Sequence, residues 1–283
     1  MATKIFCLIL NYNQPRDTLH CAKSILASRL PPSTEIILID NGPRSLKSFF
    51  AQHLPKCQYL KSPGNIGFAA GNNQGIQLAL TKGATHILII NPDVTVPPHF
   101  LYPLLQTLRA HPRAGLVAPA HTEPARNATH SVAGGGQGSY GLGGHINWRY
   151  CAFPHDNVTN LPTHPKSYDL LTFACVLIKK EVFLRAGSMD ERYFLYLEDV
   201  DYCVTAKRAG FNLLLDPQVV VTHRTSSSFA DPRAKIKYSF RSSFIFIRKW
   251  YRFPGNLLPI LHTIYFYPST YLLWTWKIFR RKM

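Results

Sequence analysis

The chain has 283 residues, with 32 Lys and Arg against 15 Asp and Glu, which gives a formal net charge of +17. Hydrophobic residues make up 46% of the chain and charged residues 17%, a balance that excludes an intrinsically disordered protein. The 21 prolines follow no repeat, which excludes collagen and argues against one long coiled coil. A chain of this length buries either one large core or two modest ones.

The first 119 residues alternate short apolar runs with helical patterns. We expect strands at residues 4–10, 35–39, 58–61, 86–90 and 115–119. We expect helices at residues 18–28, 46–53, 67–81 and 100–110. Continuous apolar strands separated by helices are typical of a parallel sheet covered on both faces, so the predicted fold class is α/β.

Polar clusters follow three of these strands: Asn11-Tyr12-Asn13, Asp40-Asn41 and Asn91-Pro92-Asp93. The carboxyl ends of parallel strands meet at one edge of a sheet, where ligands bind in such folds. We therefore expect the three clusters to converge.

Two aspartates and a histidine each allow a functional and a structural interpretation. Asp93 is well placed to hold a hard divalent cation on a diphosphate, but aspartate is also common in turns. Asp40 can accept a hydrogen bond from a base or a ribose, or it can stabilise a turn at Asp40-Asn41-Gly42. His223 closes an apolar run and is either a metal ligand or a structural histidine.

Three carboxylates are close together in Glu198-Asp199-Val200-Asp201, at the start of a helix that we expect at residues 199–209. Acidic residues in the first turn of a helix are favoured by the helix dipole. The functional interpretation is a general base at the mouth of the helix, directed into a cleft.

The rest of the second half is less regular. The glycine-rich residues 120–166 predict a mobile loop or an insertion. Structure is expected to resume at residues 168–179, followed by a helix near residues 181–186. Residues 211–222 predict two strands joined by a turn at Asp216-Pro217.

The C-terminal residues combine apolar and basic character. No acidic residue follows Asp231, and residues 256–279 are almost uncharged and aromatic before Arg280-Arg281-Lys282. Pro259 and Pro268 interrupt this stretch, so we expect an interfacial anchor against anionic lipid rather than a membrane span. A buried amphipathic helical pair with a basic surface is the alternative.

The cysteines and the N-terminal residues predict the cellular compartment of the protein. The six cysteines form no C-x-x-C pair, and several lie in apolar runs, which predicts reduced core residues in a cytosolic compartment. The N-terminal apolar run at residues 5–10 is too short for a signal peptide. The two glycosylation-like triplets at Asn127 and Asn157 are accordingly interpreted as chance matches.

Six motifs occur in order over about residues 4–230: Asn11-Tyr12-Asn13, Ile39-Asp40-Asn41-Gly42, the stretch from Asn65 to Ile76, Asn91-Pro92-Asp93, the stretch from Phe194 to Tyr202, and Thr222-His223. In this order and spacing the chain resembles glycosyltransferase family 2, the inverting nucleotide-sugar enzymes. It is most similar to the rhamnosyltransferase-like and galactofuranosyltransferase-like bacterial members.

The resemblance implies a GT-A fold and a division of the chain. Residues 1–230 would form the glycosyltransferase domain, with a nucleotide-binding half at 1–119, the flexible region at 120–166 and an acceptor and catalytic half at 167–230. Outside the resemblance, the apolar and basic character of residues 231–283 predicts a membrane-associating tail. It would hold a peripheral or C-terminally anchored protein at the cytoplasmic side of the inner membrane.

The resemblance also implies residue roles. Asp199 would be the catalytic base with Glu198 beside it, and Asp93 and His223 would bind Mg²⁺ or Mn²⁺, although Asn91 replaces the first carboxylate of the family's D-x-D motif. The nucleotide-sugar site would comprise Asn11, Tyr12, Asn13, Asp40, Asn65, Gly67, Gly71, Asn72, Asn73 and Asn91.

The expected activity is transfer of a sugar, with inversion, from dTDP-rhamnose or a similar donor to a glycan or lipid-linked acceptor in cell-surface polysaccharide synthesis. No nucleic acid is expected as a partner. The alternatives are a nucleotidyltransferase on a similar fold and a basic, non-enzymatic protein that binds nucleic acid or membranes.

Overall fold

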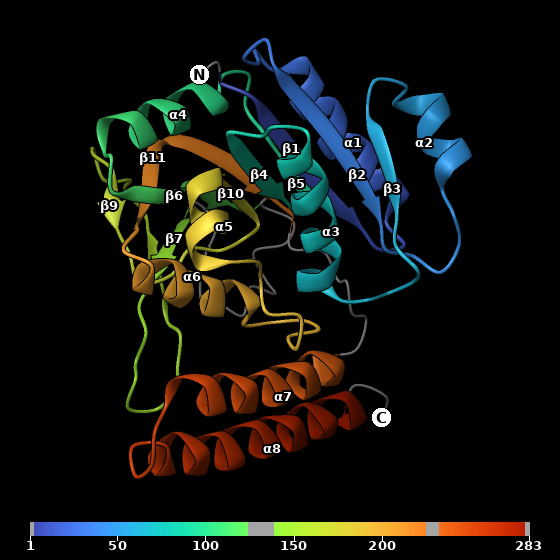
Figure 1. Ribbon diagram of the computed structural model, residues 1–283. Helices are drawn as coiled ribbons and strands as arrows, with labels where there is room; N and C mark the ends of the chain where they lie inside the picture. The colour runs from blue at the N-terminus through green and yellow to red at the C-terminus, as the bar shows by residue number, and fades with distance from the viewer. Residues whose placement is uncertain (1–2, 124–138, 225–231, 281–283) are drawn as a thin grey trace.

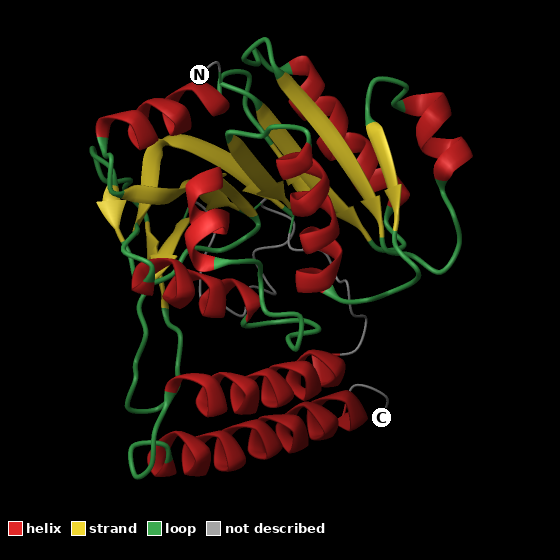
Figure 2. Ribbon diagram, viewed as in Figure 1, coloured by secondary structure: helices red, strands yellow, loops and turns green. Residues whose placement is uncertain are grey.

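The computed structural model describes residues 3–123, 139–224 and 232–280. One 11-stranded sheet forms the centre of the molecule, with helices on both faces (Figure 2). Its main path has the strand order β3-β2-β1-β4-β10-β6-β11-β5. The predicted α/β class is therefore confirmed.

The N-terminal half of the sheet is parallel. It consists of β1 (Ile5–Asn11), β2 (Thr34–Asp40), β3 (Gln58–Lys61) and β4 (His86–Ile90). In the register of β1, Asn11 pairs with Asp40 and Ile9 pairs with Ile90. The polar residues that follow these strands therefore lie at one edge of the sheet, as the sequence predicts.

Helices cover both faces of this sheet (Figure 1). The first four helices in the chain are α1 (Pro15–Ala27), α2 (Lys47–His53), α3 (Phe68–Thr81) and α4 (Leu101–Ala110). Cys21 and Ile25 of α1 and Leu104 of α4 share one buried cluster, whereas Ala69 and Ile76 of α3 belong to a second cluster on the other face. The two-sided burial explains why the strands read as continuous apolar runs.

The second half of the sheet departs from a simple parallel order. It contains β5 (Val94–Thr95), β6 (Ala114–Thr122), β10 (Cys175–Lys179) and β11 (Asn212–His223). Strand β10 runs antiparallel between β4 and β6, while β11 runs parallel to β6. The sequence prediction of two strands within residues 211–222 is wrong, because β11 continues through an irregularity between Asp216 and Val220.

Short elements lie between β6 and the last strand. They are β7 (Tyr140–Gly144), β8 (His155–Val158), β9 (Lys166–Ser167), α5 (Lys180–Ala186) and α6 (Glu198–Arg208). The region predicted as a loop at 120–166 thus contributes strands to the sheet, while residues 124–138 of that prediction lie outside the described part of the chain.

Two long helices follow: α7 (Pro232–Trp250) and α8 (Leu257–Arg280) lie side by side below the sheet (Figure 1). Helix α8 continues through Pro268, so the expected interruption at this proline is wrong. Within residues 3–123, 139–224 and 232–280, no helix has both the length and the apolar character needed to cross a membrane.

All six cysteines are free thiols, and five of them are buried. Burial raises the pKa of Cys7 to about 12 and that of Cys57 to about 11, which leaves these thiols protonated at neutral pH. Five of the six cysteines are core residues, as predicted, whereas Cys57 is partly buried, and the cytosolic compartment stays a prediction.

Candidate active site

The edge formed by β1 and β2 is held together by a buried carboxylate. Asp40 is 0% exposed, and its Oδ1 accepts hydrogen bonds from the Asn11 side chain at 3.3 Å and the Gly42 N–H at 3.2 Å. Its Oδ2 accepts from the Leu46 N–H at 2.9 Å and the Tyr59 hydroxyl at 2.6 Å. With four hydrogen bonds from the protein itself, Asp40 stabilises the conformation of this edge of the sheet. A contact between Asp40 and a base or ribose stays a prediction.

Asn11, Tyr12 and Asn13 differ in their environment. Asn11 is fully buried, and its Oδ1 accepts from the Gln14 N–H and the Thr18 hydroxyl at the start of α1. Tyr12 is 42% exposed, and Asn13 adopts a left-handed backbone with φ 54°. The exposed ring and the sharp turn place Tyr12 and Asn13 at the surface of the edge, where a ligand can reach them.

Asn41, which the motif reading did not include among the site residues, connects β2 to the loop before α3. Its Nδ2 donates to Asn65 Oδ1 and to the Gly67 carbonyl, both at 3.2 Å, and its Oδ1 accepts from the Ile66 N–H at 3.2 Å. We call residues 65–73 the donor segment. Asn41, directly after β2, therefore holds the start of the donor segment through Asn65, Ile66 and Gly67.

Gly67 must be glycine for two reasons. Its φ is +91°, and an added Cβ would lie 2.6 Å from the Phe194 carbonyl oxygen. The next residue, Phe68, donates its N–H to the same carbonyl at 2.9 Å. The donor segment is thereby joined to residues 190–201, which we call the catalytic segment.

Helix α3 uses its small and amide residues for packing. A Cβ on Gly71 would lie 2.6 Å from Leu10, so the missing side chain lets α3 approach β1. Asn73 donates to the Met189 carbonyl and to Glu191 Oε1, both at 2.9 Å. Asn72 donates to the Phe68 carbonyl at 3.0 Å, and its Oδ1 is buried without a hydrogen bond among the described residues. Ligand contact for these residues remains a prediction.

Asp93 and His223, far apart in the sequence, are brought together by the antiparallel pairing of β5 with β11. Asp93 Oδ1 lies 3.2 Å from His223 Nε2, and the Asp93 carbonyl accepts from the Arg224 N–H at 3.0 Å. Asn91 positions this turn through its backbone, since its N–H donates to Ala174 and its carbonyl accepts from Val94. The predicted metal-ligand pair is thus adjacent in space.

The geometry of this pair suits two ligands of one cation. Donor atoms at 2.0–2.1 Å from an ion and at right angles to each other are about 3.0 Å apart. Among the described residues no group of three or more His, Cys, Asp or Glu side chains is arranged to hold a metal. A cation at Asp93 and His223 would accordingly need further ligands of another kind, such as backbone carbonyls, water or oxygens of a bound donor.

The catalytic segment enters α6 through a strained turn. Tyr196 and Leu197 both have left-handed backbones, with φ 67° and 65°, directly before Glu198 and Asp199. Each such residue costs about 1–3 kcal/mol and persists where the surrounding structure requires it. The backbone conformation of this turn determines how Glu198 and Asp199 are oriented at the start of α6.

Glu198 and Asp199 occupy an environment that favours their protonated forms. Burial raises the pKa of Glu198 well above its ordinary 4.5, and the neighbouring Asp199 carboxylate raises it further. Burial also raises the pKa of Asp199, an effect opposed by the Val200 N–H and by His155. A carboxylate with a raised pKa is a stronger base, which is what a general base requires.

His121 and His155, which belong to none of the sequence motifs, act electrostatically on residues of the site. His155 interacts electrostatically with Asp199 and with His121, whose ring centroid is 6.1 Å from that of His223. Burial lowers the pKa of His121 to about 3, so this imidazole is neutral. His121 thus lies beside the Asp93 and His223 pair, and His155 is close enough to both His121 and Asp199 to act on them electrostatically.

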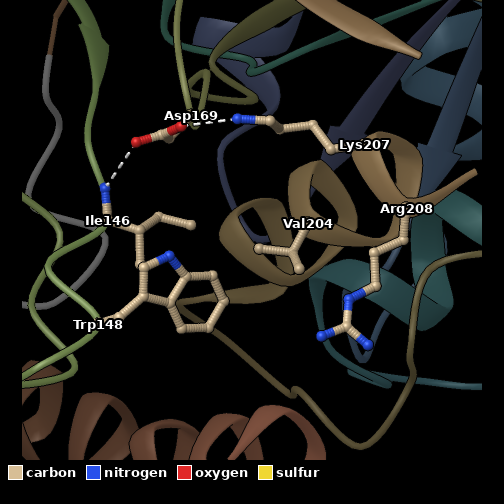
Figure 3. Close-up of a pocket in the computed structure, with 6 residues that line it drawn as sticks. All are labelled: Ile146, Trp148, Asp169, Val204, Lys207 and Arg208. Atoms are coloured by element: carbon tan, nitrogen blue, oxygen red, sulfur yellow. Dashed lines mark hydrogen bonds and ion pairs between the residues drawn. The ribbon is translucent and has the colours of Figure 1, made fainter. Parts of the chain in front are cut away.

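A separate pocket of about 230 Å³ lies beside the C-terminal half of α6 (Figure 3). It is lined by Ile146, Trp148, Asp169, Val204, Lys207 and Arg208. Lys207 donates to Asp169 at 2.6 Å. Because α6 rises 1.5 Å per residue, Lys207 lies about 12 Å along the axis from Asp199, so this pocket is not the carboxylate site.

Solved structures share this fold. GalNAc-T7 with UDP, GalNAc and Mn²⁺ aligns with a TM-score of 0.67 and 16% identity, over 87% of this chain and 48% of that one. The mannosyltransferase PcManGT from Pyrobaculum calidifontis, with GDP-Man and Mn²⁺, aligns with a TM-score of 0.60 and 14% identity, over 97% of this chain and 74% of the other. The fold is that of the GT-A glycosyltransferases.

Sequence comparison narrows the class to a family. Residues 7–158, more than half of the chain, match Glycosyl transferase family 2, and the protein belongs to that family. It is 27% identical to the N-acetylglucosaminyl-diphospho-decaprenol L-rhamnosyltransferase of Mycobacterium tuberculosis, over 81% of this chain and 80% of the relative. It is 23% identical to the dTDP-rhamnosyl transferase RfbF of Shigella flexneri, over 93% and 84%. The protein is a glycosyltransferase, and its relatives support sugar transfer in polysaccharide synthesis.

Replacing Glu198 with glutamine should make the stability of the protein less dependent on pH. The folded protein keeps a proton on Glu198 that the unfolded chain releases above pH 4.5, so this residue contributes less stability as the pH rises. Urea unfolding of both proteins at about pH 5 and pH 8 should show the variant gaining stability relative to wild type at the higher pH. Equal changes in both proteins would contradict the raised pKa.

Proposed function

We propose that the protein transfers rhamnose or a related sugar, with inversion, from a nucleoside-diphosphate donor such as dTDP-rhamnose to a glycan or lipid-linked acceptor. The observation that carries the proposal is the adjacency of Asp93 and His223, whose Oδ1 and Nε2 lie 3.2 Å apart although the residues are distant in the sequence. The electrostatic action of His155 on both His121 and Asp199 supports a position of Asp199 in the same site. The two rhamnosyltransferase relatives, with their long shared coverage, support the choice of donor.

A divalent cation, Mg²⁺ or Mn²⁺, fits the Asp93 and His223 pair. The separation of 3.2 Å between Oδ1 and Nε2 suits two neighbouring positions of one coordination sphere. The donor's diphosphate oxygens would fill further positions. When bound, the cation would neutralise the negative charge that develops on the leaving nucleoside diphosphate.

Asp199 would act on the acceptor. Its carboxylate takes the proton of an acceptor hydroxyl, and the oxygen of that hydroxyl attacks C1 of the donor sugar. The bond from C1 to the diphosphate oxygen breaks, and the electron pair leaves with the nucleoside diphosphate. Attack from the side opposite the leaving group inverts the configuration at C1.

The proposal is tested by a donor screen. UDP-, dTDP- and GDP-sugars are offered with and without Mn²⁺, together with an N-acetylglucosaminyl-diphospho-lipid acceptor, and the product is detected by mass spectrometry. We expect transfer from dTDP-rhamnose that is stimulated by Mn²⁺. Absence of transfer from every donor, or a rate unaffected by Mn²⁺ and chelator, would contradict it.

We further propose that residues 1–230 form the catalytic domain and that residues 231–283 attach it to the cytoplasmic side of the inner membrane. Several large apolar side chains of α8 are strongly exposed, including Leu261 at 63%, Tyr265 at 78% and Leu272 at 68%. Basic residues accompany them on α7, where Arg241 and Arg248 are exposed. Apolar bulk beside basic groups suits a bilayer that contains anionic lipid.

Polar substitution of the exposed α8 residues should weaken lipid binding. We expect Leu261→Gln, Tyr265→Ser and Leu272→Gln, combined in one protein, to abolish cosedimentation with vesicles that contain phosphatidylglycerol, because the apolar contact is lost. Leu184→Gln on α5 is the matched control, since Leu184 is 70% exposed but lies on another helix. Unchanged cosedimentation of the triple variant would exclude α8 as the lipid-binding surface.

A further inference from the structure

Helix α7 contacts the catalytic segment through a charge cluster centred on the buried carboxylate of Asp201. Lys249 Nζ lies 2.6 Å from Asp201 Oδ2 and 3.0 Å from Asp190 Oδ2. Asp190 also pairs with Arg192 at 2.6 Å. One lysine of the C-terminal helix therefore connects the two ends of the catalytic segment.

Asp201 is committed to this contact. It is 1% exposed, and its Oδ1 accepts from the Trp250 indole N–H at 2.8 Å and from the Tyr193 hydroxyl at 3.1 Å. A buried carboxylate needs such compensation, because leaving it unpaired is strongly unfavourable. Asp201 is thus a structural member of the acidic motif, whereas Asp199, two residues earlier, is free of these contacts to α7.

A second set of contacts holds the middle of the segment. The Ser242 hydroxyl donates to the Leu195 carbonyl at 3.0 Å, and the Phe194 ring stacks on Tyr238 at 5.2 Å between centroids. The backbone of Phe194 also contacts the donor segment, where the Phe68 N–H donates to the Phe194 carbonyl. The catalytic segment is therefore fixed between α3 and α7 (Figure 1).

The strained turn lies between these attachments. Tyr196 and Leu197 are left-handed residues, and such conformations persist only where neighbouring contacts hold them. The attachments at Leu195 and Asp201 stand on either side of the turn and of Asp199. Loss of the Lys249 contact would release one side.

We propose that Lys249 is a positioning residue, which holds the start of α6 through Asp201 and Asp190 so that Asp199 points at the acceptor. This proposal rests on the proposed role of Asp199. It gives the C-terminal helix pair a part in catalysis in addition to membrane attachment.

The test uses the full-length protein and compares three variants with wild type. Lys249→Met removes the link but leaves Asp201 unpaired, so it lowers the thermal midpoint as well as activity. In Lys249→Met/Asp201→Asn the uncompensated charge is gone while the link is still absent. Lys249→Arg keeps a cation that can reach both carboxylates.

We expect the double variant to recover most of the thermal midpoint, yet to keep a kcat reduced by roughly 10²-fold with a donor KM within about twofold of wild type. Lys249→Arg should restore much of kcat. Lys47→Met, which removes an exposed lysine of α2, should match wild type. A double variant with wild-type kcat would overturn the proposal.

Amide hydrogen exchange separates this proposal from the proposed function. Peptides that cover residues 193–202 should exchange faster in the double variant than in wild type, whichever reaction is assayed. Faster exchange with unchanged kcat would reject Lys249 as a positioning residue and leave the transfer reaction intact. Full activity of an Asp199→Asn protein would instead reject the role of Asp199.

Discussion

Replacing Asp199 with asparagine should lower the turnover number of sugar transfer by about 10²–10⁴-fold, the usual contribution of a general base. Asparagine has nearly the same shape as aspartate but cannot accept the acceptor's proton. Donor binding, measured by calorimetry with the nucleoside diphosphate, should stay within about twofold of wild type, because the base acts on the acceptor side. Glu181→Gln, on the exposed surface of α5, serves as the control.

The pH dependence of kcat provides a second test of Asp199 as the general base. Burial raises the pKa of Asp199 above its ordinary 3.8, so its basic form is lost at a higher pH than for an exposed aspartate. We expect the acid limb of the wild-type profile to lie above pH 3.8 and to be absent from any residual activity of the variant. A variant with near-normal rates would show that another group removes the proton.

Replacing Asp93 with asparagine should remove the stimulation by Mn²⁺ and weaken binding of the nucleotide donor by about 10²-fold or more. The change removes one negative charge beside His223 and leaves a weak cation ligand, whereas the side-chain volume is almost unchanged. Calorimetry with Mn²⁺ and the nucleoside diphosphate, compared with the nucleoside diphosphate alone, measures the effect directly. His223→Ala should act in the same direction.

A matched control for this experiment is Asp156→Asn, which changes a partly exposed aspartate of β8. If Asp93→Asn bound Mn²⁺ and donor as wild type does, the assignment of the metal site would be wrong. If it lost donor binding equally with and without Mn²⁺, Asp93 would support the fold of the pocket rather than hold a cation.

The parallel half of the sheet could be predicted from the sequence because each strand is a continuous apolar run between clear helical patterns. The runs at β1, β2 and β4 end in polar residues, and parallel pairing places Asn11 opposite Asp40. The sequence offers Asp93, Asp199 and His223 as separate candidates, and the resemblance of the ordered motifs assigns them to one site. The structure brings Asp93 and His223 together through β5 and β11.

The second half could not be predicted in the same way, because its order depends on contacts between distant segments. The apolar run of β10 looks like the other strands, yet it runs antiparallel between β4 and β6. Asp216-Pro217 is a good turn sequence, but pairing with β6 carries β11 through it as an irregularity. At both places the pairing between distant strands determines the structure, against the conformational preference of the local sequence.

Several residues of the site could not be predicted for the same reason, since their roles depend on contacts between distant segments. His121, His155 and Lys249 are single polar residues with no motif of their own, and their partners lie far away in the sequence. Asn41 stands in a motif, but its role depends on hydrogen bonds to residues 24 to 26 positions later. Lys249 in particular reads as one of many basic residues in a basic tail. Only its burial against Asp201 and Asp190 separates it from a membrane-facing lysine.

The central claim is that a donor held at Asp93 and His223 is attacked from the side where Asp199 removes the acceptor's proton. The most direct measurement is the anomeric configuration of the product formed from a donor of known configuration, determined by NMR before any side reaction. Attack opposite the leaving group predicts a product with the configuration at C1 reversed. A product that keeps the donor's configuration would contradict this account.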